Sequence, residues 1–481
     1  VRWDISGLDS GAGATVINLG TLSASVSNSV ANAISGDGSA VVGTTDDADG
    51  RQRAFLWREG ADHGNAHNPQ MLDIGTLGGD HSWGLGISRN GQWVVGSAEW
   101  EDMAEYDLSK AFRWSEQTGM QAIDEWLAEN GVTVVGYLTD AKFISDDGTF
   151  VGGTLHDIDN QSRVYIARVD EANGGGIMDV ESYGRTLVAN ASAASSGEFL
   201  TWLPLNGAHH RPLMAQPALS GDHCAWAIGD LAHHADQATT IGLAETGVCT
   251  DALGNGVRLG AGIGLSHAGQ NLAFGGTAQM SGHYVMGEID WMPQGTPLLF
   301  SLTGVAGQWG VDIRRGYTNG ADISYSVGET AMWGGAVRAR VDWLDAATFG
   351  NTTLSPFAAL GIGTVRLDGY TETGGAFPAR FNAQTNTTRE IRVGVTAKTE
   401  LSEQIALNTT LEAVHRAGDA PGASGQVIGL FGFDQAGGTF GNTWLRAGAE
   451  LDLRLTDATL LSASFNVATA GRDAAISGSL G

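Results

Sequence analysis

The stretch "WLRAGAELDLRL", residues 444–455, is the feature that most constrains how this chain can fold. Every second residue from Leu445 to Leu455 is Leu or Ala, and the other parity carries four charged side chains. Successive side chains of an extended strand point to opposite faces. One face of this strand is therefore apolar and the other is charged, so the two faces must lie in different environments.

The same alternation recurs about twelve times from residue 224 to the end. The expected strands span 224–234, 239–249, 257–267, 283–292, 298–309, 325–343, 353–367, 389–401, 405–416, 442–455, 459–469 and 474 onward. An even number of strands of about ten residues, joined alternately by short turns and longer loops, is typical of an outer-membrane barrel. We therefore predict an all-β chain that ends in a closed, twelve-stranded, transmembrane antiparallel β-barrel over 223–481, because an open edge in lipid leaves backbone groups unpaired.

The apolar face of these strands is expected to meet lipid, and the charged face a wet lumen. The predicted lumen residues are Arg258, Glu288, Arg338, Arg340, Asp342, Glu390, Arg392, Lys398, Glu412, Arg446, Glu450, Asp452 and Arg454. Two roles are open for them: they hold a segment inside the pore, or they pair with one another and keep the pore wet. Aromatic residues expected in interfacial girdles are Tyr284, Trp291, Trp333, Trp343 and Trp444.

Residues 1–170 contain an internal repeat. "ISGDGSAVVG" at 34–43 returns as "ISRNGQWVVG" at 87–96 and as "ISDDGTFVGG" at 144–153, and "AFLW" at 54–57 returns as "AFRW" at 111–114. Each unit predicts about four short strands with a hairpin turn at its Gly, the pattern of a β-propeller blade or a related stacked β repeat. About three units are too few to close a propeller. Since "VRW" at 1–3 matches "FRW", the chain is expected to begin inside a repeat.

The motif residues of the three units occupy equivalent positions. They are Ile34, Asp37, Gly38, Gly43, Phe55 and Trp57 in the first unit, Ile87, Asn90, Gly91, Gly96, Phe112 and Trp114 in the second, and Ile144, Asp147, Gly148 and Gly153 in the third. On these residues the repeat resembles the HAF family of extracellular bacterial repeats, with the His-Ala-Phe element changed to "RAF" at 53–55 and "KAF" at 110–112. That resemblance implies no known chemistry.

Residues 171–222 break the repeat pattern and form an expected linker. "MDVESYGRTLVANASAAS" at 178–195 is weakly helical, and "LPLNGAHHRPLM" at 203–214 is expected to be irregular. The order of repeats, linker and barrel, with "CAWAIGD" at 224–230, resembles a bacterial autotransporter of type V secretion. The resemblance implies that the linker helix threads the pore after a passenger has crossed it.

The same resemblance implies a place and partners. The barrel is expected to be monomeric in the lipid of the outer membrane of a Gram-negative cell, with the repeat domain at the cell surface. Outer-membrane assembly machinery is expected to recognise an aromatic residue at the end of the last strand. This sequence ends at "ISGSLG", residues 476–481, without that aromatic, and begins at Val1 without a leader. Both ends are therefore expected to lack residues of the full protein.

Composition excludes several other classes of protein. The formal net charge is −27, which argues against a nucleic-acid partner because nucleic acid binds basic patches. No window of about 18 apolar residues predicts a transmembrane helix. The two cysteines, Cys224 and Cys249, are directly opposed if a two-residue turn falls at Asp236-Gln237, and an oxidising envelope favours a disulfide between them. Two separate buried thiols or a slipped register are the alternatives.

Candidate metal sites are weak. "DDADG" at 46–50 and "HDIDN" at 156–160 offer clustered oxygens for Ca²⁺, but their spacing differs from an EF-hand and solvated turns explain them better. His63 and His67 are four residues apart, yet the Gly and Asn residues around them favour a loop over a zinc site. No cofactor is expected.

The sequence therefore predicts a protein that anchors in the outer membrane and translocates or displays its N-terminal repeats. No nucleophile or phosphate-binding motif is present, so we expect no enzyme activity. Three alternatives stay open: a surface hydrolase whose catalytic residues lie in missing repeats, an adhesin, and a plain pore that the repeats plug or decorate. The sequence does not indicate a ligand for the repeats.

Overall fold

A computed structural model describes the fold of residues 1–5, 13–25, 28–100, 109–172, 174–217, 221–235, 238–251, 253–419, 421–438, 441–469 and 471–481. The chain forms two compact units. Unit 1 comprises 1–185 with the short segments 317–324 and 374–377, and unit 2 comprises 186–316, 325–373 and 378–481.

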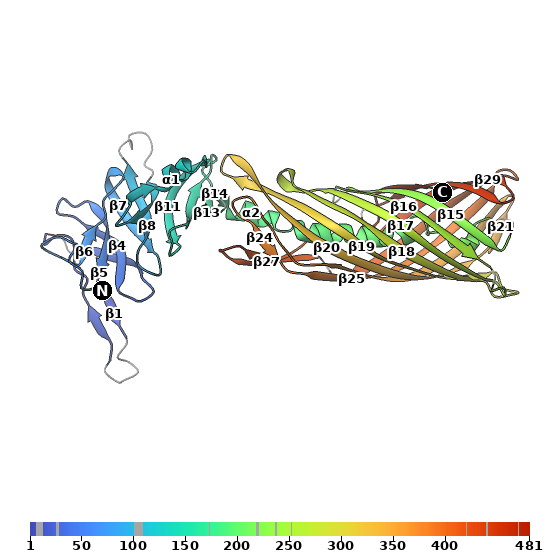
Figure 1. The fold of residues 1–481 in the computed structure, drawn as a ribbon, viewed down its shortest axis with the longest axis horizontal. Coiled ribbons are helices and arrows are strands. Elements are labelled where there is room, and N and C mark those ends of the chain that lie inside the picture. Colours follow the sequence, from blue (N-terminus) through green and yellow to red (C-terminus); the bar gives the residue numbers. More distant parts are fainter. Residues whose placement is uncertain are drawn as a thin grey trace. The chain divides into compact units, whose positions relative to one another are not determined.

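Unit 1 is built from small antiparallel sheets, shown in blue to teal in Figure 1. A two-stranded ribbon pairs β1 (Arg2–Asp4) with β2 (Thr15–Ile17). Three four-stranded sheets follow, each with its strands in chain order. They are β3 (Ser29–Ile34), β4 (Ala40–Asp46), β5 (Gln52–Arg58) and β6 (Met71–Asp73); β7 (Gly78–Ile87), β8 (Val94–Trp100), β9 (Lys110–Ser115) and β10 (Gly119–Ala122); and β11 (Tyr137–Ile144), β12 (Phe150–His156), β13 (Ser162–Asp170) and β14 (Gly174–Asp179).

These sheets repeat the four-strand unit that the sequence predicts. Neighbouring sheets bury apolar residues against each other. From the second sheet, Phe112 packs in the core shared with the first sheet, and Val95 packs in the core shared with the third. The last sheet extends further than expected, because β14 pairs with β13 and lies beyond residue 170, where we predicted the repeats to end. Gly175 and Gly176 in this strand had suggested a break in the pattern. The propeller interpretation remains a prediction.

Helices are few. They are α1 (Ile123–Glu129), which follows β10, α2 (Val180–Thr186) and α3 (Ala189–Asn206), with single 3₁₀ turns at Leu213–Ala215 and Ala273–Gly275. The linker was expected to be irregular from residue 203, but α3 continues through Pro204 to Asn206. Among the described residues, no helix has the length and apolarity needed to cross a membrane.

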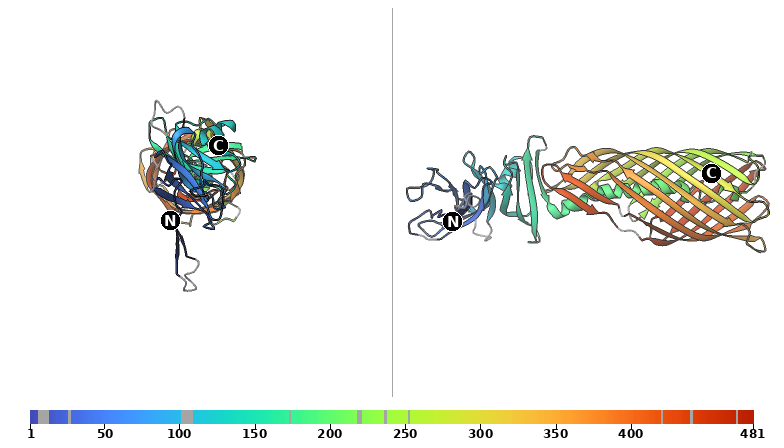
Figure 2. Two further views of the ribbon diagram at one scale, coloured as in Figure 1. Left: turned by 90° about the vertical axis from the view of Figure 1, so that its left-hand side faces the viewer. Right: turned by 90° about the horizontal axis from the view of Figure 1, so that it is seen from below.

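Unit 2 is a closed antiparallel barrel around α3 (Figure 2, right). Its twelve strands are β15 (His223–His234), β16 (Thr239–Thr250), β17 (Val257–Asn271), β18 (Thr277–Trp291), β19 (Leu298–Asn319), β20 (Asp322–Trp343), β22 (Thr352–Leu367), β25 (Gln384–Glu400), β26 (Ile405–Gly418), β29 (Thr443–Thr456), β30 (Thr459–Ala468) and β31 (Ile476–Leu480). The first and last strands, β15 and β31, pair and close the sheet. The predicted fold class is confirmed, including all twelve strands.

Short strands decorate one end of the barrel. β23 (Tyr370–Thr371), β24 (Ala379–Phe381), β27 (Gly422–Val427) and β28 (Gly432–Ala436) form a separate four-stranded sheet, and β21 (Ala347–Phe349) pairs with β22 at the other end. The separate sheet is built from the β22–β25 and β26–β29 connections. The long connections therefore gather at one end of the barrel, as in outer-membrane barrels.

Side chains alternate between the two barrel faces as predicted. Ile263, Leu265 and Leu360 are exposed on the outer face, whereas Arg338, Arg392 and Glu412 are buried within. The aromatic girdle is a partial correction. Trp291, Trp333 and Trp343 are exposed on the outer face, but Tyr284 and Trp444 are buried on the lumen parity of their strands. The error arises because proximity to a strand end was weighed above side-chain parity.

Candidate functional site

The lumen is filled by α3, whose single charged residue is fixed by the barrel wall. The helix sequence is "ANASAASSGEFLTWLPLN", and Glu198 is its only ionisable side chain. Its Oε1 lies 3.2 Å from Arg416 Nη1 and 3.3 Å from Arg472 Nη1. All three side chains are buried. A helix buried on every side shows no amphipathic pattern, and this one contacts strands that are not neighbours in the wall, β17 and β22.

Small residues in the wall make room for the large side chains of the helix. Trp202 donates from Nε1 to Thr388 Oγ1 at 3.1 Å. A Cβ at Gly361 or Gly363 of β22 would lie 2.7 Å or 2.9 Å from the Trp202 ring. These lumen glycines therefore shape a groove for the indole, which explains why small residues alternate with apolar residues in β22.

Two arginines cap the C-terminal end of α3. Arg338 donates to the carbonyl oxygens of Leu205 and His209, and Arg446 Nη2 donates to the carbonyl oxygen of Asn206 at 2.8 Å. The last carbonyls of a helix lack intrahelical partners and carry partial negative charge. Cations at this end therefore satisfy the backbone and favour the helix dipole at the same time.

The chain that follows α3, residues 207–214, crosses the lumen, and we call it the strap. His209 Nε2 lies 2.5 Å from Glu245 Oε1, and its Nδ1 lies 3.5 Å from Glu288 Oε2. Arg211 makes a two-pronged contact with Asp452, at 2.7 Å and 2.9 Å. Paired, two-pronged contacts of this kind are among the stronger and more directional hydrogen bonds in proteins.

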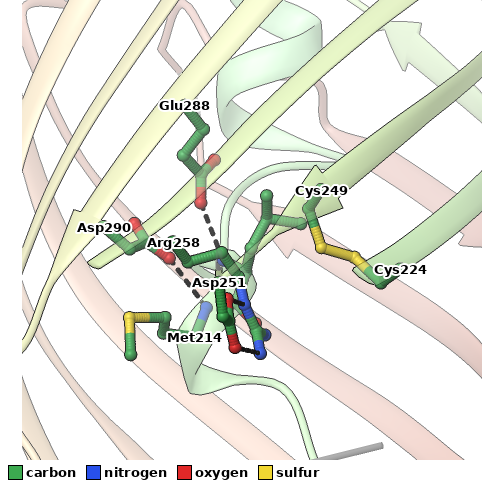
Figure 3. The surroundings of a disulfide bond; sticks show 8 residues. Met214, Cys224, Cys249, Asp251, Arg258, Glu288 and Asp290 are labelled. Atoms are coloured by element: carbon green, nitrogen blue, oxygen red, sulfur yellow. Dashed lines mark hydrogen bonds and ion pairs between the residues drawn. A yellow bond between two sulfur atoms is a disulfide. The ribbon is translucent and has the colours of Figure 1, made fainter. Parts of the chain in front are cut away.

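The end of the strap is held through its backbone (Figure 3). The amide of Leu213 donates to Glu288 Oε1 and that of Met214 to Asp290 Oδ2, both at 2.7 Å. Arg258 donates to the Leu213 carbonyl at 3.0 Å while pairing with Asp251 through two nitrogens. The barrel wall thus recognises the strap by backbone as well as by side chain, which fixes its register.

The lumen charges also pair with one another. Arg392 contacts Glu390, Glu412 and Asp473, at 2.5 Å, 2.9 Å and 2.8 Å. Arg416 contacts Glu390 as well, and Arg446 Nη1 lies 2.9 Å from Glu412 Oε1. Buried charges need partners of opposite sign. Both roles considered for these residues are therefore present in the structure: they pair with one another and they hold the helix and strap.

The remaining predicted lumen residues complete the picture. Arg340 pairs with Asp342 through two nitrogens and donates from Nη1 to the His210 carbonyl at 2.8 Å. Glu450 accepts a bond from Arg211 Nη2 at 2.9 Å. Lys398 pairs with Glu400 near the end of β25, and Arg454 is half-buried near the end of β29.

A disulfide links the first two strands of the barrel. Cys224 and Cys249 are directly opposed in the β15–β16 register, with their Cα atoms 4.9 Å apart, and their sulfur atoms are bonded (Figure 3). The separation lies within the range that a disulfide spans without backbone movement. The predicted turn at Asp236-Gln237 lies outside the described residues.

In unit 1 the repeat motif closes equivalent turns. In the first unit Asp37 Oδ1 accepts bonds from the Ser35 hydroxyl at 2.6 Å and from the Ser39 amide at 3.0 Å. The Ser35 hydroxyl and the Ser39 groups hold the pKa of Asp37 at about 2. The other two units use Ser88 with Asn90 at 2.7 Å, and Ser145 with Asp147 at 2.5 Å. Gly38, Gly91 and Gly148 of these turns have φ of 76°, 72° and 75°, the region that favours glycine.

The motif glycines allow a close backbone contact within each repeat, and the motif aromatics are buried. Each unit has a register shift in its first strand, between Ala31 and Ala33, Gly84 and Gly86, and Ala141 and Phe143. At that point a carbonyl approaches the facing glycine, so a Cβ would lie 1.9 Å from an oxygen at Gly43 and at Gly96, and 2.1 Å at Gly153. Phe55, Trp57, Phe112 and Trp114 are buried, as is Ile144, while Ile34 is exposed and Ile87 lies between.

The two acidic hairpin loops use a carboxylate to close their own turns. Asp47 Oδ1 accepts the amides of Asp49 and Arg51, both at 2.9 Å. Asp157 Oδ1 does the same for Asp159 and Gln161, at 3.0 Å and 2.8 Å. His63 Nε2 lies 3.0 Å from the Gln70 carbonyl oxygen, in a loop. Within the described ranges, no group of three or more metal-ligating side chains is gathered.

Several residues of the lumen site were missed at the sequence level. Glu198, Glu245, Arg416 and Arg472 are buried there, and Asp473 contacts Arg392 and Arg416. Strand parity was a usable signal for Glu245 and Arg416, each the only acid or arginine of its strand. Asp473 and Arg472 lie in the connection before β31, where alternation gives no information. Glu198 was detectable only as the lone charge of an otherwise uncharged segment.

The barrel is similar to a known family and to solved structures. Residues 229–466 match the family model described as the autotransporter beta-domain. No curated protein sequence matches the chain. Among solved structures, the translocator domain of autotransporter NalP from Neisseria meningitidis is 16% identical, with 61% of this chain and 95% of that chain covered and a TM-score of 0.46. The beta domain of the Bordetella autotransporter BrkA is 16% identical, with 54% of this chain and 98% of that chain covered and a TM-score of 0.42.

Proposed function

We propose that this chain, whose residues 229–466 form an autotransporter β-domain, displays its own N-terminal repeats at the cell surface and keeps them attached there. The protein is an outer-membrane autotransporter with a barrel that exports a passenger. Its passenger is exposed on the surface. We propose that the passenger consists of the HAF-like repeat sheets β3 to β14 and that it stays attached to the barrel.

One observation carries this proposal: the chain is continuous through a lumen that grips it. From α3 to the end of the strap, buried groups of β16, β18, β20, β26 and β29 contact the threaded segment. A segment so held anchors whatever precedes it in the chain. The arrangement supports a state in which export is complete and the helix remains in the pore.

The repeats are proposed to serve display and not catalysis. The carboxylates that recur in them, such as Asp37 and Asp47, are engaged in closing their own turns. Their role is therefore structural. We further propose that outer-membrane assembly machinery closes the barrel where β31 meets β15, the five-residue seam that ends the twelve-strand sheet.

An epitope tag tests the orientation and the attachment. A tag inserted between Ala48 and Asp49, in the exposed β4–β5 hairpin turn, should be reached by antibody on intact cells. The matched control is a tag between Asp457 and Ala458, in the exposed β29–β30 turn at the end of the barrel away from the long connections, which should stay hidden until the membrane is opened. The proposal fails if the first tag is found in the medium or only after lysis.

A further inference from the structure

The outer face of the barrel has a groove where four strands run side by side. The groove has a volume of about 450 Å³ and is lined by β18, β19, β20 and β22, which are neighbours in the barrel wall. The first three of these strands are labelled side by side in Figure 1. Val285 and Trp333 on its walls are 53% and 49% exposed, whereas Tyr284 and Met332, on the other parity, are buried. The groove therefore opens toward lipid and not toward the lumen.

The groove exists because two outward positions carry almost no side chain. Ala306 faces Val285 across β18 and β19, and Gly335 faces Thr364 across β20 and β22. A Cβ at Gly335 would lie 3.4 Å from its nearest neighbour, the Val305 carbonyl oxygen, which is an ordinary contact. A larger side chain would therefore fit at residue 335 without a clash. The groove is present because glycine and alanine occupy these two outward positions.

Polar side chains border the groove one step further along the strands. His283 is directly opposite Gln308, and Trp333 is directly opposite Arg366. This is the side toward the β19–β20 hairpin tip, whose residues 317–324 belong to the same unit as the surface-exposed repeats. Trp and polar groups at this position are typical of a membrane–water interface.

The border carries cations although the chain has a net charge of −27. Exposed acids, Asp312 and Glu329, lie further toward the hairpin tip, and exposed outward-facing cations and histidines recur on the same side of the barrel. They are His267, His283, Arg366, Arg389 and His415. Arg366 also pairs with Asp368 through Nε at 2.9 Å, an exposed contact that engages one of the five N–H donors of its guanidinium.

We propose that this groove binds one molecule of lipid A, the phosphorylated, multiply acylated glycolipid of the outer leaflet. One acyl chain fills the space over Ala306 and Gly335, and Arg366 and His283 contact the headgroup phosphate. Arginine binds phosphate oxygens in a two-pronged geometry, and an apolar chain lying in the groove covers the surface that the missing side chains leave. The border and the groove together match a ligand that is anionic at one end and apolar at the other.

The test is native mass spectrometry of the full chain extracted from cells in mild detergent. The wild-type protein should retain one lipid A. The variant A306L/G335L, which fills the groove, and the variant H283Q/R366Q, which removes the border charges, should each retain about tenfold less, a loss of about 1.4 kcal/mol. Adding dephosphorylated lipid A back to delipidated wild type should restore less binding than the phosphorylated form.

Matched controls place the same changes elsewhere on the outer face. A358L enlarges an exposed position of β22 outside the groove, and R314Q removes an exposed arginine of β19 beyond the border. Both should retain lipid A as wild type does. Folding of every variant is checked by its heat-modifiable migration in gels, and if A306L/G335L does not fold, H283Q/R366Q decides the outcome. Equal lipid A in variants and wild type, phospholipid as the retained species, or no retained lipid would each overturn the proposal.

Discussion

Removing the carboxylate of Glu198 should loosen α3 in the barrel. Glu198 is the only charge that the helix contributes, and its loss leaves Arg416 and Arg472 without that partner in a buried site. Breaking a buried ion pair from one side costs about 3–5 kcal/mol. The lower end applies here, because the contacts are 3.2 Å and 3.3 Å long and Arg416 keeps its contacts with Glu390 and Asp473.

A cost of about 3 kcal/mol changes a two-state equilibrium by roughly a hundredfold. If the helix must leave the lumen for ions to pass, the open probability of E198A in a planar lipid bilayer should exceed that of wild type by about this factor. E198Q should fall between the two, since it keeps the shape and loses the charge. The assay reports the equilibrium directly, because each opening is a single conductance step.

The control is E181Q. Glu181 is an exposed residue of α2 whose contacts with Arg163 and Arg185 are 3.4 Å and 3.5 Å long, so its removal should change stability by less than about 1 kcal/mol. An open probability for E198A within twofold of wild type would refute the reasoning that the ion pairs hold the helix.

Three further predictions concern the disulfide, the repeat glycines and acid. Replacing Cys224 and Cys249 by Ser should lower the free energy of unfolding in detergent by at most about 3.5 kcal/mol, the loop-closure value for a sequence separation of 25, and denaturant titration measures it. Gly96→Ala should raise hydrogen exchange in β7 and β8, because its Cβ would lie 1.9 Å from a carbonyl oxygen, at a cost of about 1–3 kcal/mol, whereas Gly438→Ala, with open space around it, should not. Hydrogen bonds from serine hydroxyls and an amide lower the pKa of Asp37 from 3.8 to about 2, so the stability that its carboxylate adds is present above pH 3.8 and is lost as the pH falls to 2. Pepsin should therefore cleave the repeats of D37N and of wild type at different rates at pH 4 and at the same rate at pH 2.

The strand positions of the barrel were predictable because lipid and water enforce a period of two. The strand bounds were less predictable at the end of the barrel where β19 and β20 join. β19 runs to Asn319 and β20 begins at Asp322, whereas the predicted strands covered 298–309 and 325–343. Beyond the apolar surface both faces of a hairpin meet polar surroundings, and alternation ends although pairing continues. The sequence signal therefore measures the membrane-facing span and not the length of the strand.

The helix was harder to predict for a related reason. A helix at a protein surface has one apolar stripe, but residues on all sides of α3 are buried by the barrel wall. Its partners are supplied by strands tens or hundreds of residues away, such as Arg446 for the Asn206 carbonyl. Pro204 lies inside the helix near its end, and the arginines near the helix terminus satisfy carbonyls there.

The placement of those arginines also gives the threaded segment a direction. Arg338 and Arg446 contact the carbonyl end of α3, where partial negative charge gathers, and the carboxylates of Glu288 and Asp290 receive the amides of Leu213 and Met214. A segment threaded the opposite way would bring N–H groups to the arginines and carbonyls to the carboxylates, and each contact would change from attraction to repulsion. The lumen is therefore complementary to one polarity of the chain. That polarity places the N-terminal end of α3 at the end of the barrel at which the long connections gather, so the same charges that hold the helix also fix its direction in the lumen.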